Sequence, residues 1–66
     1  MKFEEALAAM RQRKFVKRKD WNDYKMYLLY DTNILSFMSL TDRTQGAFVM
    51  ELSAENIMAE DWEVVE

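Results

Sequence analysis

Two neighbouring segments of this sequence lack a polar face, and this feature constrains the fold most. In residues 25–31, KMYLLYD, and in residues 34–40, ILSFMSL, apolar side chains occupy both of the alternating sets of positions that point to opposite faces of a strand. In the first segment one set is Met26, Leu28 and Tyr30, and the other is Tyr27 and Leu29. Asp31-Thr32-Asn33 is typical of a turn, so we predict a β-hairpin whose strands both require cover on two sides.

The segments before this hairpin predict a helix and a strand. Apolar residues at helical spacing, with acids in the first turn and cations in the last, predict a helix over residues 3–12. Phe15-Val16 in a polar surround predicts a short strand that ends near Arg18. Residues 20–23 have the composition of a turn.

The segments after the hairpin predict three more elements. A loop that contains the only glycine, Gly46, predicts a second hairpin that continues as a strand over residues 47–52, and we expect a positive φ at this glycine. Ser53 is placed to cap a helical turn over residues 54–58. Residues 62–65 predict a terminal strand.

Together these elements predict an α+β fold, with an N-terminal helix packed on a small antiparallel β-sheet and a short second helix before the last strand. A chain of 66 residues has room for one core, and no linker or repeat divides it, so we expect a single domain over residues 1–66. One helix covers only one face of a sheet. The second apolar face of the central strands therefore predicts a homo-oligomer.

Missing residue types argue against most kinds of catalytic and metal site. The chain has no His and no Cys, which removes the usual general base near neutral pH, thiolate nucleophiles and the commonest zinc ligands. A single Gly is too few for a glycine-rich phosphate loop. We therefore expect a protein that is not an enzyme and that carries no cofactor and no metal.

Charge and hydropathy limit the partners and the location. A net charge of -3 argues against general binding of DNA or RNA. Cations gather in residues 11–19 and acids gather near the C-terminus, so these two charged segments can face each other in the fold. No apolar run approaches the roughly 20 residues that span a bilayer, and the acidic N-terminus is unlike a signal peptide. We expect a cytoplasmic protein without a membrane partner.

The turn between the first two strands combines groups that suit a nucleotide. Arg18 can bind phosphate oxygens at two points, the indole of Trp21 offers a flat face to a base, and the carboxamide of Asn22 can pair with a base or ribose. Tyr24 lies two residues after Asn22. Alternatively, Trp21 is a hydrophobic lid over the helix and Asn22 only shapes the turn. Trp62, in the last strand, is typical of a core residue.

Three stretches of the sequence resemble one family of small phage-encoded domains. They are FEEALAAMRQRKFVKRKDWN at residues 3–22, MYL at residues 26–28 and SAENIMAEDWEVVE at residues 53–66. Family members typically read F-x-E-A-L-x-x-(L/M)-x-x-G-K-x-V-x-R-x-x-W-N near the start and L-A-x-D-W-x-(V/I) at the end. The most specific matches are Arg18-x-x-Trp21-Asn22 and Met58-Ala59-x-Asp61-Trp62. This family includes the second type of Thoeris anti-defence protein.

The resemblance implies a protein that sequesters a cyclic signalling nucleotide without cleaving it, in the cytoplasm of an infected bacterium. It implies a helix on an antiparallel sheet and a homo-oligomer, commonly a tetramer. The implied ligand is the glyco-cyclic ADP-ribose of Thoeris immunity, and some relatives hold cyclic dinucleotides of the CBASS defence. The resemblance and the chemistry of the turn together indicate these candidate ligand-binding residues: Arg18, Trp21, Asn22, Tyr24, Met26, Asp61 and Trp62.

The sequence departs from the family at three places. Relatives often have a longer insertion at Asp31-Thr32-Asn33, a Gly where this chain has Asp23, and Pro-Trp where this chain has Met50-Glu51. Loss of that second aromatic side chain can reshape the base pocket. The competing hypothesis is a small interaction module, without a nucleotide site, that inhibits a host protein through an apolar sheet face.

Overall fold

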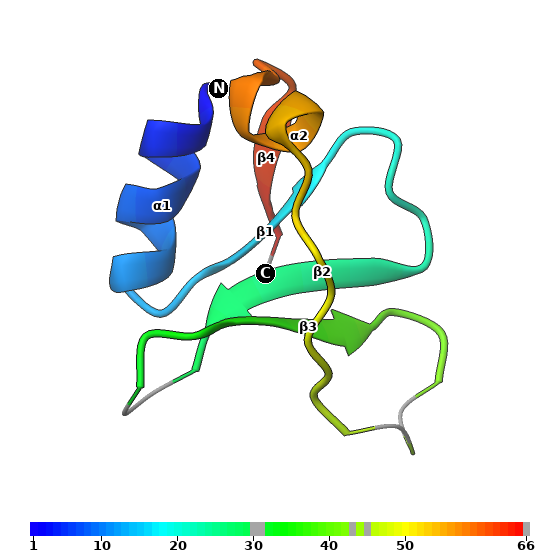
Figure 1. Ribbon diagram of the computed structural model, residues 1–66. Helices are drawn as coiled ribbons and strands as arrows, with labels where there is room; N and C mark the ends of the chain where they lie inside the picture. Colours follow the sequence, from blue (N-terminus) through cyan, green and yellow to red (C-terminus); the bar gives the residue numbers. More distant parts are fainter. Residues whose placement is uncertain (30–31, 43, 45, 66) are drawn as a thin grey trace.

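The computed structural model describes residues 1–29, 32–42, 44 and 46–65. In this described part the elements are α1 (Phe3–Arg11), β1 (Phe15–Arg18), β2 (Tyr24–Leu28), β3 (Leu35–Ser39), α2 (Ala54–Met58) and β4 (Trp62–Val65). The strands form one antiparallel sheet in the order β3-β2-β1-β4 (Figure 1). The predicted α+β fold is confirmed, including the short helix before the last strand.

Helix α1 confirms the helix predicted over residues 3–12 to within one residue. After its C-terminal end, a residue type that rarely adopts a positive φ does so. Arg13 has a φ of 67°, in the left-handed region. Its N–H donates to the carbonyl of Met10 at 2.9 Å, and the N–H of Lys14 donates to the carbonyl of Ala9 at 3.2 Å. This pair of bonds closes many helices, but glycine is the usual residue at the left-handed position.

Strands β2 and β3 form the predicted hairpin, although both are shorter than the predicted strands. Leu29 and Ile34 lie just outside the ladder, and the N–H of Leu29 donates to the carbonyl of Ile34 at 2.9 Å. Asn33 adopts a φ of 55°, as turn chemistry allows, and its N–H donates to the carbonyl of Leu29. Tyr30 and Asp31, which we predicted in the strand and the turn, lie outside the described residues.

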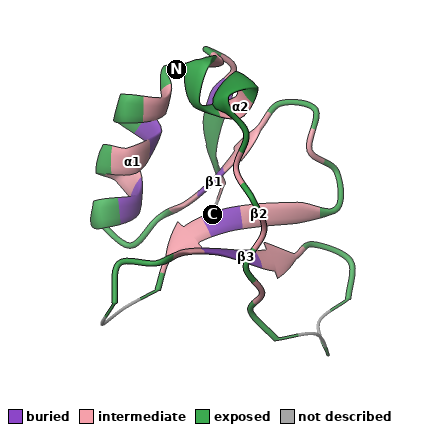
Figure 2. Ribbon diagram, in the orientation of Figure 1, coloured by how far each residue is buried: buried purple, intermediate pink, exposed green. Residues whose placement is uncertain are grey.

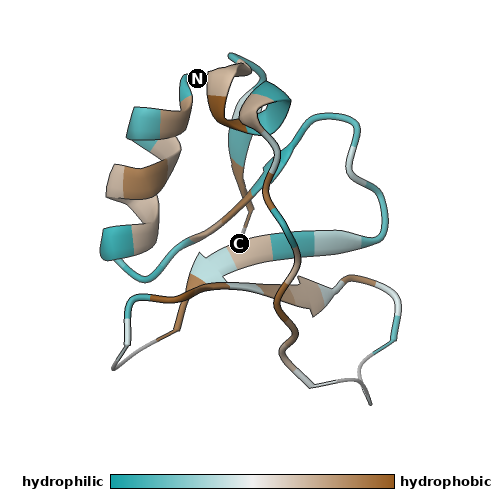
Figure 3. Cartoon of the chain, in the orientation of Figure 1, coloured by the Kyte–Doolittle hydropathy of each residue, from teal (hydrophilic) through white to brown (hydrophobic). Residues whose placement is uncertain are grey.

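Residues 47–52 do not form the predicted strand. Phe48 makes a single antiparallel bridge with Phe37, with N–O distances of 2.8 and 3.0 Å. The chain then crosses the sheet face toward α2 (Figure 1), and much of this crossing segment, residues 47–52, has the apolar colour in Figure 3. Phe48, Met50 and Leu52 pack against the core, so burial on the sheet face replaces further strand pairing.

The expectation for Gly46 is also wrong. Its φ is not positive, and a Cβ added to it would meet no atom within 4 Å. The loop is open at this point, so neither backbone conformation nor close packing requires glycine. Among the described residues, Arg13 and Asn33 have the positive φ angles instead.

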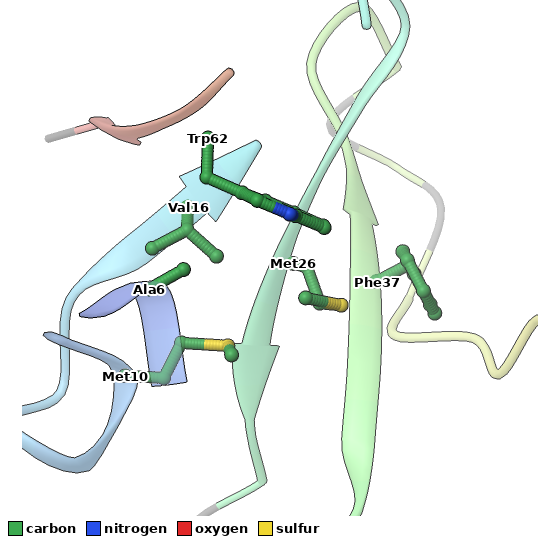
Figure 4. Packing of buried hydrophobic residues seen from close by; sticks show 6 residues of the cluster. All are labelled: Ala6, Met10, Val16, Met26, Phe37 and Trp62. Carbon is green, nitrogen blue, oxygen red and sulfur yellow. The ribbon is translucent and has the colours of Figure 1, made fainter. Parts of the chain in front are cut away.

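The core lies on one face of the sheet (Figure 4). Its six buried apolar residues are Ala6, Met10, Val16, Met26, Phe37 and Trp62. Helix α1 contacts β1, β2 and β4, while the crossing segment packs on the same core beside β3. Figure 2 shows the buried positions on α1, β2 and β3. Trp62, 2% exposed, is a core residue, as its type suggested.

The opposite face of the sheet is less apolar than predicted. From the strand register, this far face carries Phe15, Lys17, Lys25, Tyr27, Ser36, Met38, Glu63 and Val65. Phe15 and Tyr27 pack edge to face at 5.3 Å, and the Lys25 ammonium lies 3.9 Å from the centre of the Phe15 ring. On this face β2 carries Lys25 and Tyr27 and β3 carries Ser36 and Met38, while Leu29 and Ile34 fall beyond the strand ends.

Candidate functional site

The loop between β1 and β2 holds Trp21 in a closely bonded turn. The N–H of Trp21 donates to the carbonyl of Arg18 at 3.0 Å. From the far face, the Lys17 Nζ donates to three carbonyls of this turn, those of Arg18, Lys19 and Trp21, at 3.3, 3.4 and 3.0 Å. These bonds hold the turn in place.

The indole of Trp21 rests on aromatic side chains of the sheet. Its ring centre lies 4.7 Å from that of Tyr24, 5.1 Å from that of Trp62 and 6.0 Å from that of Phe37. Trp62 is itself fixed, because its Nε1 donates to the carbonyl of Asn56 at 2.9 Å. Trp21 remains half-buried.

An ion pair lies beside this aromatic group. Arg18 binds Asp61 at two points, with Nε–Oδ1 at 2.7 Å and Nη2–Oδ2 at 3.2 Å, and its Nη1 donates to Oδ1 of Asn56 at 2.9 Å. The hydrogen bond from Arg18 lowers the pKa of the Asp61 carboxyl below its ordinary value. The same bond raises the pKa of Arg18, so both groups are charged near neutral pH.

The structure brings some of the predicted site residues together and places others in the core. Arg18, Trp21, Tyr24 and Asp61 are all partly exposed, and Asn22 is exposed on the loop. Met26 and Trp62 are 0% and 2% exposed. Within a single chain, Met26 and Trp62 therefore lie in the core and are not accessible to a ligand.

The contacts of Trp21 bear on the lid interpretation. That interpretation placed the indole over the helix, whereas its ring contacts are with Tyr24, Phe37 and Trp62, at the start of β2, in β3 and in β4. Trp21 packs against aromatic side chains of the core and is still partly exposed to solvent. It is thus both a packing residue and an accessible aromatic surface.

Sequence reasoning missed two residues that position this group: Lys17, through its side chain, and Asn56, through its side chain and its backbone carbonyl. Lys17 fastens the Trp21 turn, and Asn56 binds both Arg18 and Trp62. The signal for Lys17 was its place one residue before Arg18, which puts it on the opposite face of β1 beneath the same turn. The idea that the basic and acidic segments face each other is confirmed by the Arg18–Asp61 and Lys17–Glu63 pairs, the latter at 3.0 Å.

This arrangement has the chemistry of a recognition surface. It combines an aromatic ring, a guanidinium with N–H groups beyond the three that bind Asp61 and Asn56, and a carboxylate that can accept a hydroxyl proton. Among the described residues, neither helix is long and apolar enough to cross a membrane.

A helix packed on an antiparallel sheet is the architecture that the sequence resemblance implied. Residues 1–65 match the family model Tad2-like, the Thoeris anti-defense 2-like domain, and the chain belongs to this family. Neither the curated proteins nor the solved structures include a match to the chain. The family resemblance carried by Arg18-x-x-Trp21-Asn22 and the C-terminal motif is therefore confirmed.

Proposed function

We propose that this protein binds a cyclic nucleotide signal of bacterial immunity and withholds it from its receptor without cleaving it. Membership of the Tad2-like family supports a phage anti-defence role directed at Thoeris. Glyco-cyclic ADP-ribose is the first candidate ligand, and a cyclic dinucleotide of the CBASS defence is the second. The setting for this activity is the cytoplasm of an infected bacterium.

The observation that carries this proposal is the position of Trp21. Trp21 is partly exposed, its indole rests on Tyr24 and Trp62, and Lys17 holds the turn that contains it. A base that stacks on such a surface gains about 1 to 3 kcal/mol. Because the turn is ordered beforehand, less of this gain is lost to ordering the protein.

Arg18 and Asp61 supply polar contacts in the proposed site. Three of the five N–H groups of Arg18 bind Asp61 and Asn56, which leaves two for a phosphate oxygen. Asp61 offsets the charge of Arg18, so we assign Arg18 to directional hydrogen bonding more than to net attraction. Asp61 can also accept a hydrogen bond from a ribose hydroxyl, and Asn22 and Tyr24 lie at the rim.

Sequestration makes a quantitative demand. A protein that depletes a signal by stoichiometric binding needs a dissociation constant in the nanomolar range, or about -12 kcal/mol. We therefore propose tight binding and no catalytic step.

We also propose that the protein assembles as a homo-oligomer, a tetramer by family resemblance, through the far face. Phe15, Tyr27 and Met38 lie there partly exposed, and α1 packs on the other face. Lys17 and Glu63 put both charge signs on the same surface, so one copy can complement another across a two-fold axis. The alternative, a host protein bound by this face, needs no nucleotide.

Calorimetry with a panel of cyclic nucleotides tests the proposed function. We expect saturable nanomolar binding of one or more cyclic nucleotides, and intact ligand in the supernatant after the complex is denatured. Binding with recovery of a cleaved product would indicate an enzyme. No binding across the panel would favour the interaction module.

A further inference from the structure

Asn56 of α2 joins the two parts of the proposed site, the ion pair of Arg18 and the aromatic side chains that contact Trp21. Its Oδ1 accepts from Arg18 Nη1 at 2.9 Å, and its backbone carbonyl accepts from Trp62 Nε1 at 2.9 Å. Its own backbone N–H donates to Ser53 Oγ at 3.3 Å. These three bonds hold both the backbone and the carboxamide of Asn56 in one position.

The chemistry of Arg18 determines which end of this carboxamide is free. A guanidinium has only donors, so the carboxamide oxygen faces it and the NH2 group is turned away from that bond. Within the described part of the chain, Nδ2 of Asn56 has no acceptor. No buried side-chain N or O atom of this part lacks a partner, and Asn56 is half-buried, so Nδ2 reaches the surface. Asn56 therefore presents two N–H donors that the fold does not use.

The free donors of Asn56 and Arg18 lie close enough to bind one group together. Standard bond lengths put the O and N atoms of an amide about 2.3 Å apart. With the 2.9 Å bond between Oδ1 and Nη1, the Nδ2 atom lies within about 5 Å of Nη1. Each donor reaches about 2.9 Å to its acceptor, so the oxygens of a single phosphate can accept from both residues.

The charges at this place also favour a neutral donor. Asp61 offsets the charge of Arg18, so a phosphate beside Arg18 depends on directional N–H groups more than on net attraction. An ionised phosphate oxygen only accepts, whereas a carboxamide NH2 only donates. The two N–H groups of Asn56 thus match this ligand group without requiring a further cation.

We propose that Asn56 contacts the ligand, with its Nδ2 donating to the same phosphate that Arg18 binds. This inference rests on the proposed function and deepens it, because it defines a phosphate subsite made of Arg18 and Asn56 beside the stacking surface of Trp21. The subsite does not require a base, so it can be tested with a ligand that has none.

Inorganic pyrophosphate is a suitable probe, and NMR follows its binding. We expect the side-chain NH2 signals of Asn56 and the Nε–H signal of Arg18 to shift together and to saturate, which sodium chloride at the same ionic strength should not reproduce. Asn56→Asp keeps an oxygen for Arg18 but replaces the NH2 group with an acceptor, and it should weaken pyrophosphate binding at least about tenfold. Asn56→Leu removes the donors without adding charge and should also weaken it about tenfold. Ala54→Asp, which adds the same charge at an exposed position of α2, should change it little.

Thermal unfolding separates ligand contact from a structural role. Asn56→Asp should melt at or above the wild-type temperature, because a carboxylate binds a guanidinium more strongly than a carboxamide does. The proposal is overturned if the Asn56 NH2 signals do not respond to pyrophosphate, if Asn56→Leu binds it as the wild type does, if Ala54→Asp weakens it as much as Asn56→Asp, or if Asn56→Asp melts below the wild type.

Failure of this subsite and failure of the proposed function are distinguishable. Pyrophosphate binding at Asn56 by a protein that binds no cyclic nucleotide would refute nucleotide sequestration and support the phosphate subsite. Tight binding of a cyclic nucleotide that Asn56→Leu leaves unchanged would support sequestration and overturn the role of Asn56.

Discussion

Arg18 and Asp61, 43 positions apart in the sequence, form a two-point ion pair that joins the end of β1 to the residue before β4. The two most specific family motifs therefore meet in space, one from each end of the chain. Asn56 of α2 binds the same guanidinium. The pair fixes where Arg18 points, which is the property that directional recognition of a phosphate requires.

We predict that Arg18→Ala weakens nucleotide binding by roughly 1.5 to 3 kcal/mol, because a hydrogen bond to a charged group is lost. Arg11→Ala removes an equal charge at the end of α1 and should leave nucleotide affinity nearly unchanged. Arg18→Lys should not restore affinity, since an ammonium cannot bind Asp61 at two points and keep donors for the ligand. Calorimetry measures all three. Equal losses at Arg11 and Arg18 would show diffuse attraction.

The ion pair also predicts how stability depends on pH. The folded-state pKa of Asp61 is lower than its ordinary value of 3.8, so the unfolded chain binds the proton more readily. The stabilisation is present above that value and is lost as the pH falls through the folded-state pKa. Urea titrations at a series of pH values should show the free energy of unfolding falling more steeply with acid in the wild type than in Asp61→Asn. Glu60→Gln, an exposed neighbour, should follow the wild-type curve, and parallel curves for Asp61→Asn and the wild type would contradict the assignment.

Much of the fold could be predicted because local patterns determine it. The helical spacing before Arg11, the Ser53 cap and the turn composition between the two hairpin strands each act over a few residues. The side chain of Ser53 indeed accepts from the N–H of Asn56. The strand prediction for the crossing segment was wrong because it followed from a second hairpin at the Gly46 loop, whereas Phe48, Met50 and Leu52 pack on the sheet face. Their burial is set by the rest of the core.

The candidate site was only partly predictable for a different physical reason. Trp21 and Arg18 were predicted as site residues because their side chains have chemistry that suits a nucleotide. Lys17 binds backbone carbonyls of the turn, and Asn56 binds Arg18, which is distant in the sequence. These contacts can be recognised only from the register of β1 with β4 and from the position of α2. A positive φ was expected at Gly46 but occurs at Arg13, because the geometry of the helix end determines that φ rather than the residue type.

Trp21 should be required for nucleotide binding beyond its role in packing. Trp21→Leu keeps an apolar side chain against Tyr24 and Trp62 but removes the stacking surface. We expect it to unfold cooperatively near the wild-type temperature and to lose about 1 to 3 kcal/mol of nucleotide affinity. Trp21→Ala should lose both binding and some stability. If Trp21→Leu binds the nucleotide as the wild type does, the indole is a lid only.

The far face should mediate self-association. We predict that the protein is an oligomer at micromolar concentration by light scattering, and that Met38→Glu dissociates it by placing an unpaired charge in the contact. Val49→Glu is the matched control, because Val49 is 70% exposed and lies in the crossing segment on the other side of the sheet. A wild-type protein that scatters as a 7.9 kDa monomer would refute assembly through this face.

Lys17 should position Trp21 rather than contact the ligand. Lys17→Met keeps the aliphatic stem but removes the ammonium that holds three carbonyls of the turn. We expect nucleotide affinity to fall by about 0.5 to 1.5 kcal/mol and the N–H of Trp21, which donates to Arg18, to exchange faster with solvent.

Glu63→Gln separates the turn contacts from the ion pair of Lys17. Glu63 is half-exposed in that pair, so its neutralisation should cost at most about 1 kcal/mol of stability and leave the exchange rate of the Trp21 N–H unchanged. Hydrogen exchange followed by NMR distinguishes the two variants, since a general loss of stability would speed exchange throughout the sheet. If Lys17→Met and Glu63→Gln have the same effect on both measurements, then Lys17 acts through Glu63 alone and does not order the Trp21 turn.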